Sequence, residues 1–455
     1  MKLEPYSATK AFFVSSAVWF VVGTSLGFLD ATHLAAPELL SDIGFLVFSR
    51  TRPMHTNVVI FGFVGTGLLG ASLYILPSLL KTGLYSERLG VASLWLWNLS
   101  VAAGTVTLSV GYSQGREYAE WIWPVDIGIL AGFALVFYNL FMTAMRRKEK
   151  ILYVSNWYIF AGVLFIFLIY FFGNAVWNPR SGAIQGLRDA ILAWFYGHGI
   201  VGLFLTPLAI AVSYYIVPRV VNSPLYSHSL SLVGFWSILV IYTHIGSHHL
   251  LQTPIPTWLK VFGIIGSIGM FVPVLTVLVN LWLTMRGRLG LIHADMGGKF
   301  VMAGLVWYAL VCIQGPLQSL AIVQRVTHLN NWVIGHAHIA VLGFSGFIML
   351  GGIYYILPRI TGRPIYSSRL ADIQYWLVLI GLTGFLLILT AAGLIQGNGW
   401  MNGELEYRLL PEVHLYMVLR AYSGVFIVIG AFIGLYNMLR SVYGTAPTTE
   451  EDKAP

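Results

Sequence analysis

The chain has 455 residues, of which 57% are hydrophobic and only 10% are charged, and its mean hydropathy is +0.76. This composition excludes a water-soluble globule, because about a quarter of the residues of a soluble domain are charged. The net charge of +8 does not indicate nucleic-acid binding, since no basic patch is interleaved with exposed aromatic residues. The sequence therefore predicts an all-α, polytopic membrane protein whose partners include the lipid bilayer but no nucleic acid.

Apolar windows of about 20 residues, the length that crosses a hydrocarbon layer about 30 Å thick, recur along the chain. We expect twelve transmembrane helices, at roughly 11–29, 55–79, 88–112, 122–146, 151–177, 187–218, 229–252, 257–285, 296–324, 332–357, 370–396 and 413–440. Residues 1–445 would form a single membrane domain without an internal repeat, and residues 446–455 a disordered tail.

The basic residues predict the orientation of these spans. If the N-terminus is cytoplasmic, 17 of the 26 Lys and Arg residues lie in the tails and even-numbered loops. The positive-inside rule then puts both termini in the cytoplasm, as in a multi-pass protein of a bacterial or archaeal cytoplasmic membrane. The first span lacks the pattern of a removable signal and should remain a helix. The single cysteine, Cys312, excludes a covalent c-type haem and a two-cysteine copper centre within this chain, so electrons must arrive from elsewhere.

Histidines are the most informative polar residues of the apolar segments. Buried imidazole is costly in lipid without a partner, and haem iron and copper are partners that bind it well. Six histidines are candidates for such buried metal or haem ligands, namely His55, His198, His248, His249, His336 and His338. For the others we expect interfacial places (His33, His228, His293, His328) or structural packing that includes haem propionates (His244, His414).

His336 and His338 are two residues apart, so on a helix they point about 200° apart and emerge on opposite faces. One helix can therefore bind two haems, one on each side. His338 needs a second axial ligand for a six-coordinate haem, and His55 at the start of the second span is the natural candidate. A bis-histidine haem transfers electrons without binding substrate, whereas the haem on His336 would keep an open iron.

The adjacent pair His248 and His249 could share one metal with His198 if a strained turn, assisted by Gly246, brings the rings together. Three imidazoles without thiolate or carboxylate suit copper and leave a position for oxygen. Tyr242 lies close to two helical turns before the pair and can share its side of the helix. A phenol there could donate a proton and an electron to O–O cleavage; the alternative is a hydrogen-bonded core tyrosine.

Five segments occur in series, namely RTRPMHTNVVIFGF, GYSQGREYAEWIWP, WFYGHGIVGLFLT, the YxxxxxHH spacing from Tyr242, and NWVIGHAHIAVLG. With them the chain resembles subunit I of the haem–copper oxidases, specifically the C-family or cbb3-type cytochrome c oxidases. The resemblance implies the fold of haem–copper oxidase subunit I. It also implies that the protein reduces oxygen to water, coupled to proton uptake or pumping, with electrons from a membrane-anchored c-type cytochrome.

The resemblance also implies the site residues. It assigns low-spin haem b to His55 and His338, high-spin haem b to His336, copper to His198, His248 and His249, and a redox-active tyrosine to Tyr242, cross-linked to His198. It further places Arg52 among the haem-binding residues and calcium near the haem propionates.

The nitric oxide reductases, which convert NO to N2O, are the competing family. They resemble the chain at all six histidines but hold non-haem iron in place of copper, with a glutamate ligand four residues after the sixth-span histidine and without the tyrosine. Here that position is Gly202, and Tyr242 is present, so both differences favour copper and oxygen. A twelve-span secondary transporter is a third alternative, disfavoured because neither inverted repeats nor intramembrane carboxylates are evident.

One segment departs from the cbb3-type pattern. Where those enzymes usually read EGP, this chain has Gln314-Gly315-Pro316, and an amide cannot release a proton near neutral pH. Either Gln314 replaces the glutamate as a hydrogen-bonding isostere, or protons travel otherwise, or the chemistry has shifted toward nitric oxide. With no obvious mid-membrane carboxylate, proton uptake would depend on hydroxyl groups, among which the candidates are Tyr308, Ser267 and Thr276.

Overall fold

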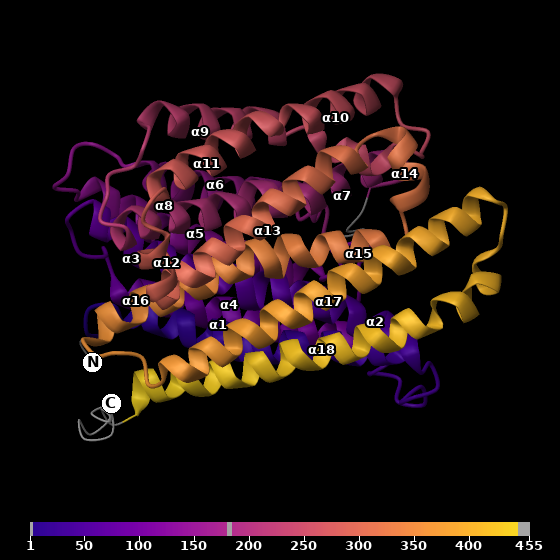
Figure 1. The fold of residues 1–455 in the computed structure, drawn as a ribbon, viewed down its shortest axis with the longest axis horizontal. Helices are drawn as coiled ribbons and strands as arrows, with labels where there is room; N and C mark the ends of the chain where they lie inside the picture. The colour runs from indigo at the N-terminus through magenta and orange to yellow at the C-terminus, as the bar shows by residue number, and fades with distance from the viewer. Residues whose placement is uncertain (1–2, 180–183, 445–455) are drawn as a thin grey trace.

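The computed structural model describes residues 3–179 and 184–444, and within these ranges it contains helices and no strand. The predicted tail 446–455 lies outside the described residues. The long helices run along a common axis, and the start of the chain and the end of α18 lie at the same end of the bundle (Figure 1).

The α-helices are α1 Ser7–Ala35, α2 Phe48–Asn57, α3 Thr66–Leu79, α4 Glu87–Ser109, α5 Trp123–Met145, α6 Val154–Gly173, α7 Leu187–Gly199, α8 Thr206–Val220, α9 His228–Tyr242, α10 Thr257–Gly269, α11 Phe271–Met285, α12 Leu289–Ala294, α13 Met296–Gln318, α14 Ala321–Thr327, α15 Asn331–His338, α16 Phe347–Thr361, α17 Ser368–Met401 and α18 Glu406–Tyr443. Three π-helical segments, η1 Val58–Gly65, η2 Ile200–Leu205 and η4 Ile339–Gly346, join α2 to α3, α7 to α8 and α15 to α16. The 3₁₀ segment η3 spans Ile245–Leu250.

Eleven helices in the described ranges are long and apolar enough to cross a membrane, and each coincides with an expected span. The expected seventh span, 229–252, is not one continuous helix. It consists of the 15-residue apolar helix α9, which ends at Tyr242, followed by the 3₁₀ turn η3. The helix stops before the paired histidines, so the chain can change direction at the point where a straight helix would have separated their rings.

The expectation that the chain lacks an internal repeat is wrong. Three stretches of equal length align without gaps, namely LYILPSLLKTGLYSERL (73–89), YYIVPRVVNSPLYSHSL (214–230) and YYILPRITGRPIYSSRL (354–370). Each carries the end of one helix, a turn and the start of the next. The proline-containing helix ends of α3, α8 and α16 are therefore equivalent, and α4, α9 and α17 are their equivalent successors.

Each repeat closes with the same hydrogen-bonded clamp. In the middle copy Ser227 caps α9, and Asn280 of α11 accepts from the Ser227 N–H and donates to its carbonyl. The other copies pair Ser86 with Asn139, and Ser367 with Asn437. All three asparagines are fully buried. A buried amide that satisfies both backbone groups of a helix cap fixes the start of one helix against its neighbour.

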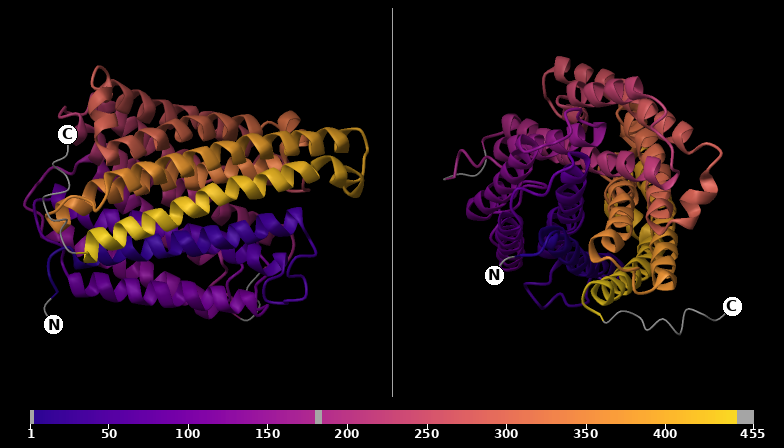
Figure 2. Two further views of the ribbon diagram at one scale, coloured as in Figure 1. Left: turned by 60° about the horizontal axis from the view of Figure 1, so that its bottom comes forward. Right: turned by 90° about the vertical axis from the view of Figure 1, so that its left-hand side faces the viewer.

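The π-helical segments lie at the centre of the bundle. Each begins within three residues after a histidine, namely His55, His198 or His338. Such wide turns occur frequently at functional sites. Segment η4 contacts both η1 and η2, while the early, middle and late parts of the chain occupy successive sectors around the axis in the end-on view (Figure 2). The three sectors therefore meet where the histidines are.

Replacing Asn280 with alanine removes both hydrogen bonds to Ser227 and leaves buried backbone groups unpaired, which should cost about 2–4 kcal/mol. We expect a melting temperature several degrees below that of the parent in detergent, measured by loss of helical circular dichroism. Thr383→Ala is the control, since this exposed hydroxyl bonds only to Leu379 of its own helix. Equal melting temperatures for the two variants would show that the clamp does not stabilise the fold.

Candidate functional site

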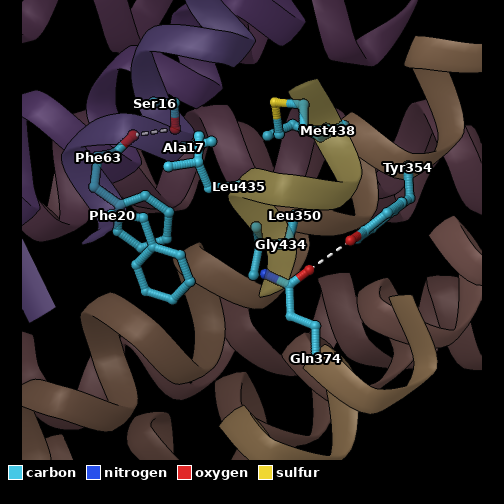
Figure 3. Close-up of a pocket in the computed structure, with 11 residues that line it drawn as sticks. Ser16, Ala17, Phe20, Phe63, Leu350, Tyr354, Gln374, Gly434, Leu435 and Met438 are labelled. Atoms are coloured by element: carbon cyan, nitrogen blue, oxygen red, sulfur yellow. Dashed lines mark hydrogen bonds between the residues drawn. The ribbon is translucent and has the colours of Figure 1, made fainter. Parts of the chain in front are cut away.

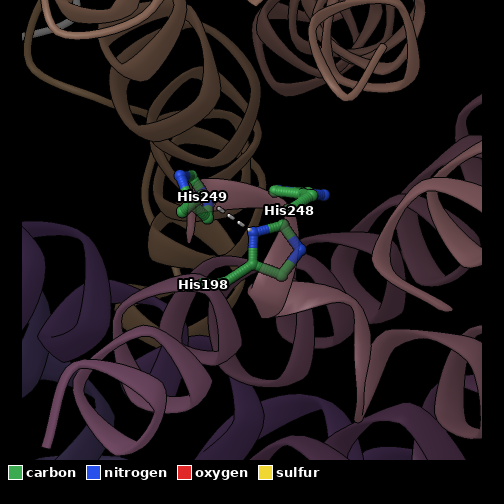
Figure 4. A group of neighbouring side chains, drawn as sticks. All are labelled: His198, His248 and His249. Atoms are coloured by element: carbon green, nitrogen blue, oxygen red, sulfur yellow. Dashed lines mark hydrogen bonds between the residues drawn. The ribbon is translucent and has the colours of Figure 1, made fainter. Parts of the chain in front are cut away.

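Three histidines form a cluster of potential metal ligands (Figure 4). One ligand atom from each of His198, His248 and His249 lies within 4.8 Å of the others, and His198 Nδ1 is 3.1 Å from His249 Nε2. A metal about 2 Å from each nitrogen would need them about 3.3 Å apart. Small shifts of the rings would therefore allow the three nitrogens to bind one ion. The buried His198 Nε2 has no hydrogen-bond partner among the described residues.

The turn η3 brings the adjacent histidines together. Between Tyr242 and Ile245 the chain leaves the helix, and η3 then directs both His248 and His249 toward His198 at the end of α7. Gly246 allows the approach, because a Cβ there would lie 2.5 Å from the Trp194 carbonyl oxygen and 3.3 Å from His198 Cβ. The sequence predicted a role for Gly246, and the structure assigns it to close packing against α7.

Hydrogen bonds select the nitrogen that each ring offers. Ser267 donates its hydroxyl proton to the Gly263 carbonyl at 2.6 Å, so at 2.6 Å from His248 it must accept the proton of Nδ1. His248 therefore keeps Nε2 free for a metal. Ser267, expected as a candidate for proton uptake, contacts a histidine of the cluster. Trp194, which sequence reasoning missed, stacks on His249 with ring centres 4.0 Å apart.

Tyr242 lies beside the cluster. Its ring stacks on His198, with centres 4.4 Å apart and planes 7° from parallel. Beneath it is Gly202 in η2, four residues after His198, where a Cβ would overlap the ring carbons of Tyr242. A side chain at residue 202 and the ring of Tyr242 therefore exclude each other. The sequence contained both residues, but only the fold shows that they compete for the same space.

His55 and His338 face each other from different helices, with ring centres 6.1 Å apart and planes 18° from parallel. His55 donates Nδ1–H to the Gly23 carbonyl and His338 to the Ile334 carbonyl, both at 2.8 Å. Nε2 of each ring is thereby left without the proton. An iron bound to two imidazoles at about 2 Å each requires ring centres about 6 Å apart, so this pair fits a bis-histidine haem.

His336 points to a different set of neighbours from His338. Its Nδ1 is 3.1 Å from Gln314 Oε1 of α13, and Trp332 is stacked on it with ring centres 5.6 Å apart. His338 instead packs on Phe385 of α17, with ring centres 4.4 Å apart. The two side chains thus leave one helix in different directions, as their spacing predicted.

A charged group adjoins His55 one helical turn earlier. Arg52 pairs with Glu117 at 2.6 Å and with Glu120 at 3.3 Å, and Asn57 donates to Glu120 at 2.9 Å. Burial raises the pKa of the Glu120 carboxyl, while the Asn57 hydrogen bond and the charge of Arg52 oppose this shift. Burial also raises the pKa of Tyr118 to about 12. Arg52 therefore pairs with two carboxylates, and its single positive charge balances only one of them.

Arg420, which the sequence placed inside the last span, is a second cation near the His55 and His338 pair. It is buried in α18 with its guanidinium carbon 5.3 Å from the centre of the Phe385 ring. Within the described part of the chain, its Nε and Nη1 have no hydrogen-bond partner. Asp30 of α1 is also buried and accepts from Thr51 at 2.5 Å. A buried intramembrane cation is itself a signal of function that sequence reasoning left unused.

Three of the remaining histidines differ from expectation, and one of them is His244, which was expected to pack in the interior but is exposed. His33, expected at an interface, is buried in the last turn of α1, and His414, expected to pack in the interior, is exposed. A small cavity between α1, η1, α16, α17 and α18 lies apart from the histidines (Figure 3). Its polar groups are already paired, with Ser16 donating to the Phe63 carbonyl and Tyr354 to Gln374, so we assign it no chemistry.

Comparison with known proteins identifies the family. Residues 7–426 match the family model described as cytochrome c and quinol oxidase polypeptide I. The cbb3-type cytochrome c oxidase subunit CcoN1 of Stutzerimonas stutzeri is 31% identical, over 97% of this chain and 96% of that protein. A nitric oxide reductase subunit of the same species is 24% identical, over 96% and 95% of the two chains.

The fold agrees with this result. The solved structure of a heme-copper terminal oxidase dimer superimposes with a TM-score of 0.82 at 17% identity, covering 97% of this chain and 85% of that chain. At this identity the likeness concerns the fold alone, whereas the matched family model and the relative above 30% identity concern descent. The chain therefore belongs to the cytochrome c and quinol oxidase polypeptide I family and is related to the cbb3-type subunit over nearly its full length.

Proposed function

We propose that this chain is the oxygen-reducing subunit of a cbb3-type cytochrome c oxidase, taking electrons from a membrane-anchored c-type cytochrome and coupling the reaction to proton uptake or pumping. The observation that carries the proposal is the ring of Tyr242, stacked on His198 in the space that Gly202 leaves open. It puts a phenol beside three imidazoles, and oxygen cleavage needs both a proton and an electron from such a neighbour.

The histidines divide among three cofactors in this proposal. His55 and His338 would bind a low-spin haem b, because their rings are opposed at the separation that one iron needs. His336 would bind a high-spin haem b, and the cluster of His198, His248 and His249 would bind copper. When bound, the high-spin iron and the copper supply the site for oxygen and most of the electrons.

The residues around these ligands orient them. Backbone carbonyls, Ser267 and Gln314 hold protons on Nδ1 and leave Nε2 available. Trp194 restricts the ring of His249 by stacking. Tyr242 lies close enough to His198 to deliver a proton and an electron to the site. Its cross-link to His198 stays a prediction.

The charged groups next to His55 suit the outer edges of the haems. Arg420 has donors without a hydrogen-bond partner among the described residues, so a haem propionate is a suitable partner for it. Glu117 and Glu120, with Arg52 between them, offer oxygen ligands and charge for a calcium ion shared with propionates. Proton uptake would depend on hydroxyl groups, with Tyr308, Ser267 and Thr276 as the candidates.

Nitric oxide reduction is the second candidate, favoured by the amide at Gln314 and by the 24% identity to a nitric oxide reductase subunit. That chemistry would place non-haem iron in the cluster. Iron of this kind prefers a carboxylate among its ligands. The ligand group in the described residues consists of imidazoles alone, and residue 202 cannot supply the carboxylate. We therefore prefer copper and oxygen.

Metal analysis of the purified complex, combined with turnover of both gases, separates the two functions. We expect copper in an amount equal to the protein and consumption of oxygen with reduced cytochrome c as donor. Non-haem iron without copper, together with faster turnover of nitric oxide than of oxygen, would instead establish the second candidate.

Removal of His336 tests the assignment of the haems. In His336→Ala we expect the reduced protein to lose its carbon monoxide difference spectrum while it retains the bands of the bis-histidine haem, because His55 and His338 are untouched. His414→Ala is the matched control, since this histidine is exposed and should leave both spectra unaltered. Carbon monoxide binding that survives in His336→Ala would exclude His336 as the ligand.

Gly202→Ala tests the role of Tyr242. The added methyl group should push the ring away from His198 and lower oxygen turnover about 100-fold, as misplacement by about 1 Å can. Carbon monoxide binding to the reduced protein should persist. Gly269→Ala is the control, because its Cβ would make only ordinary contacts, the nearest at 3.6 Å. Full oxygen turnover in Gly202→Ala would mean that the placement of Tyr242 is unimportant.

A further inference from the structure

Among the described residues, Gln314 makes the one polar contact to Nδ1 of His336. Its amide oxygen Oε1 is 3.1 Å from that nitrogen, and the two residues come from different helices, α13 and α15. The amide could in principle present its NH2 group instead. His336 Nδ1 would then accept, the ring proton would move to Nε2, and Nε2 could no longer bind a metal. Binding of iron through Nε2 therefore requires the amide orientation seen here.

The other contacts of His336 restrict the ring without polarising it. Trp332 stacks on it with planes 12° from parallel, and Gly315 lies nearby, where even an added Cβ would remain 3.8 Å from His336 Cε1. Neither neighbour accepts a proton from Nδ1. Gln314 alone among these neighbours holds the ring by a hydrogen bond, which joins α13 to His336 and limits rotation of the imidazole about its Cβ–Cγ bond.

The acceptor is neutral, and this has a chemical consequence. A carboxylate that receives the Nδ1 proton of a metal-bound imidazole raises the basicity of that ligand, and a hydrogen bond to a charged acceptor is roughly twice as strong as one to a neutral acceptor. An amide gives the weaker effect. The iron then receives less electron density, which favours its ferrous form.

We propose that Gln314 is a positioning residue that keeps His336 a neutral, weakly donating ligand and thereby raises the reduction potential of the haem bound there. The inference rests on the proposed function in one respect, namely that His336 binds the high-spin haem. Gln314 would then set the electronic character of that ligand. His55 and His338 also donate to neutral acceptors, the carbonyls of Gly23 and Ile334, so in the described ranges none of the three haem ligands donates to an anionic group.

The test compares the holoenzyme with Gln314→Glu and Gln314→Met, two side chains of similar length. In Gln314→Glu we expect a higher iron–histidine stretching frequency in the resonance Raman spectrum of the reduced protein. The ratio of ferrous to ferric haem at a fixed potential should fall about tenfold, which is a midpoint lower by about 59 mV for one electron. In Gln314→Met the acceptor is lost, and the stretching band should move to lower frequency and broaden.

The low-spin haem is an internal control, because its ligands bond to backbone carbonyls that the variants leave unaltered. Its midpoint should be the same in all three proteins. The proposal is overturned if the parent and both variants bind the high-spin haem with the same stretching frequency and the same midpoint. A parent protein without a high-spin haem, or carbon monoxide binding that survives loss of His336, would overturn the proposed function instead, so the two failures are distinguishable.

Discussion

An imidazole can bind a metal through Nε2 only if its proton is held on Nδ1, and this constraint governs the interior of the molecule. Four histidines satisfy it by hydrogen bonds at Nδ1: His55 and His338 to carbonyls, His336 to an amide and His248 to a hydroxyl. Three of these acceptors lie on other helices, and the fourth, the Ile334 carbonyl, is one turn earlier in the helix of His338 itself. The helices therefore decide which nitrogen is available, and a displaced helix would change the chemistry before it changed the fold.

The internal repeat explains how four helix-borne histidines meet at the centre. His55 and His336 lie equally far before Pro77 and Pro358, and His198 and His338 lie equally far before Pro218 and Pro358. The third copy thus carries both histidines and the other two carry one each. Because the π-helical segments follow these histidines and contact one another, equivalent parts of three units converge on one region. The cluster with η3 is the addition that breaks this symmetry.

Much of this arrangement could be predicted from the sequence. Hydropathy located the spans, and the angular advance of a helix separated His336 from His338. The rest depends on contacts between distant segments. Nothing local shows that Ser267 faces His248, that Gln314 faces His336 or that the ring of Tyr242 covers Gly202. The repeat is hard to detect in the sequence because its copies share few residues beyond the tyrosines, prolines and serines of the turns. The asparagines of the clamps lie many residues away from these turns.

The mutual exclusion at residue 202 also constrains how this protein could acquire another activity. A glutamate there would overlap the ring of Tyr242, so it could enter only if that ring left its place beside His198. Loss of the tyrosine alone would leave a hole beside His198 without a carboxylate. A single change therefore either forces two side chains into one space or removes the phenol without supplying the carboxylate. Exchange between the two chemistries requires paired substitutions, so the packing of one ring over one glycine acts as a barrier to evolutionary drift between them.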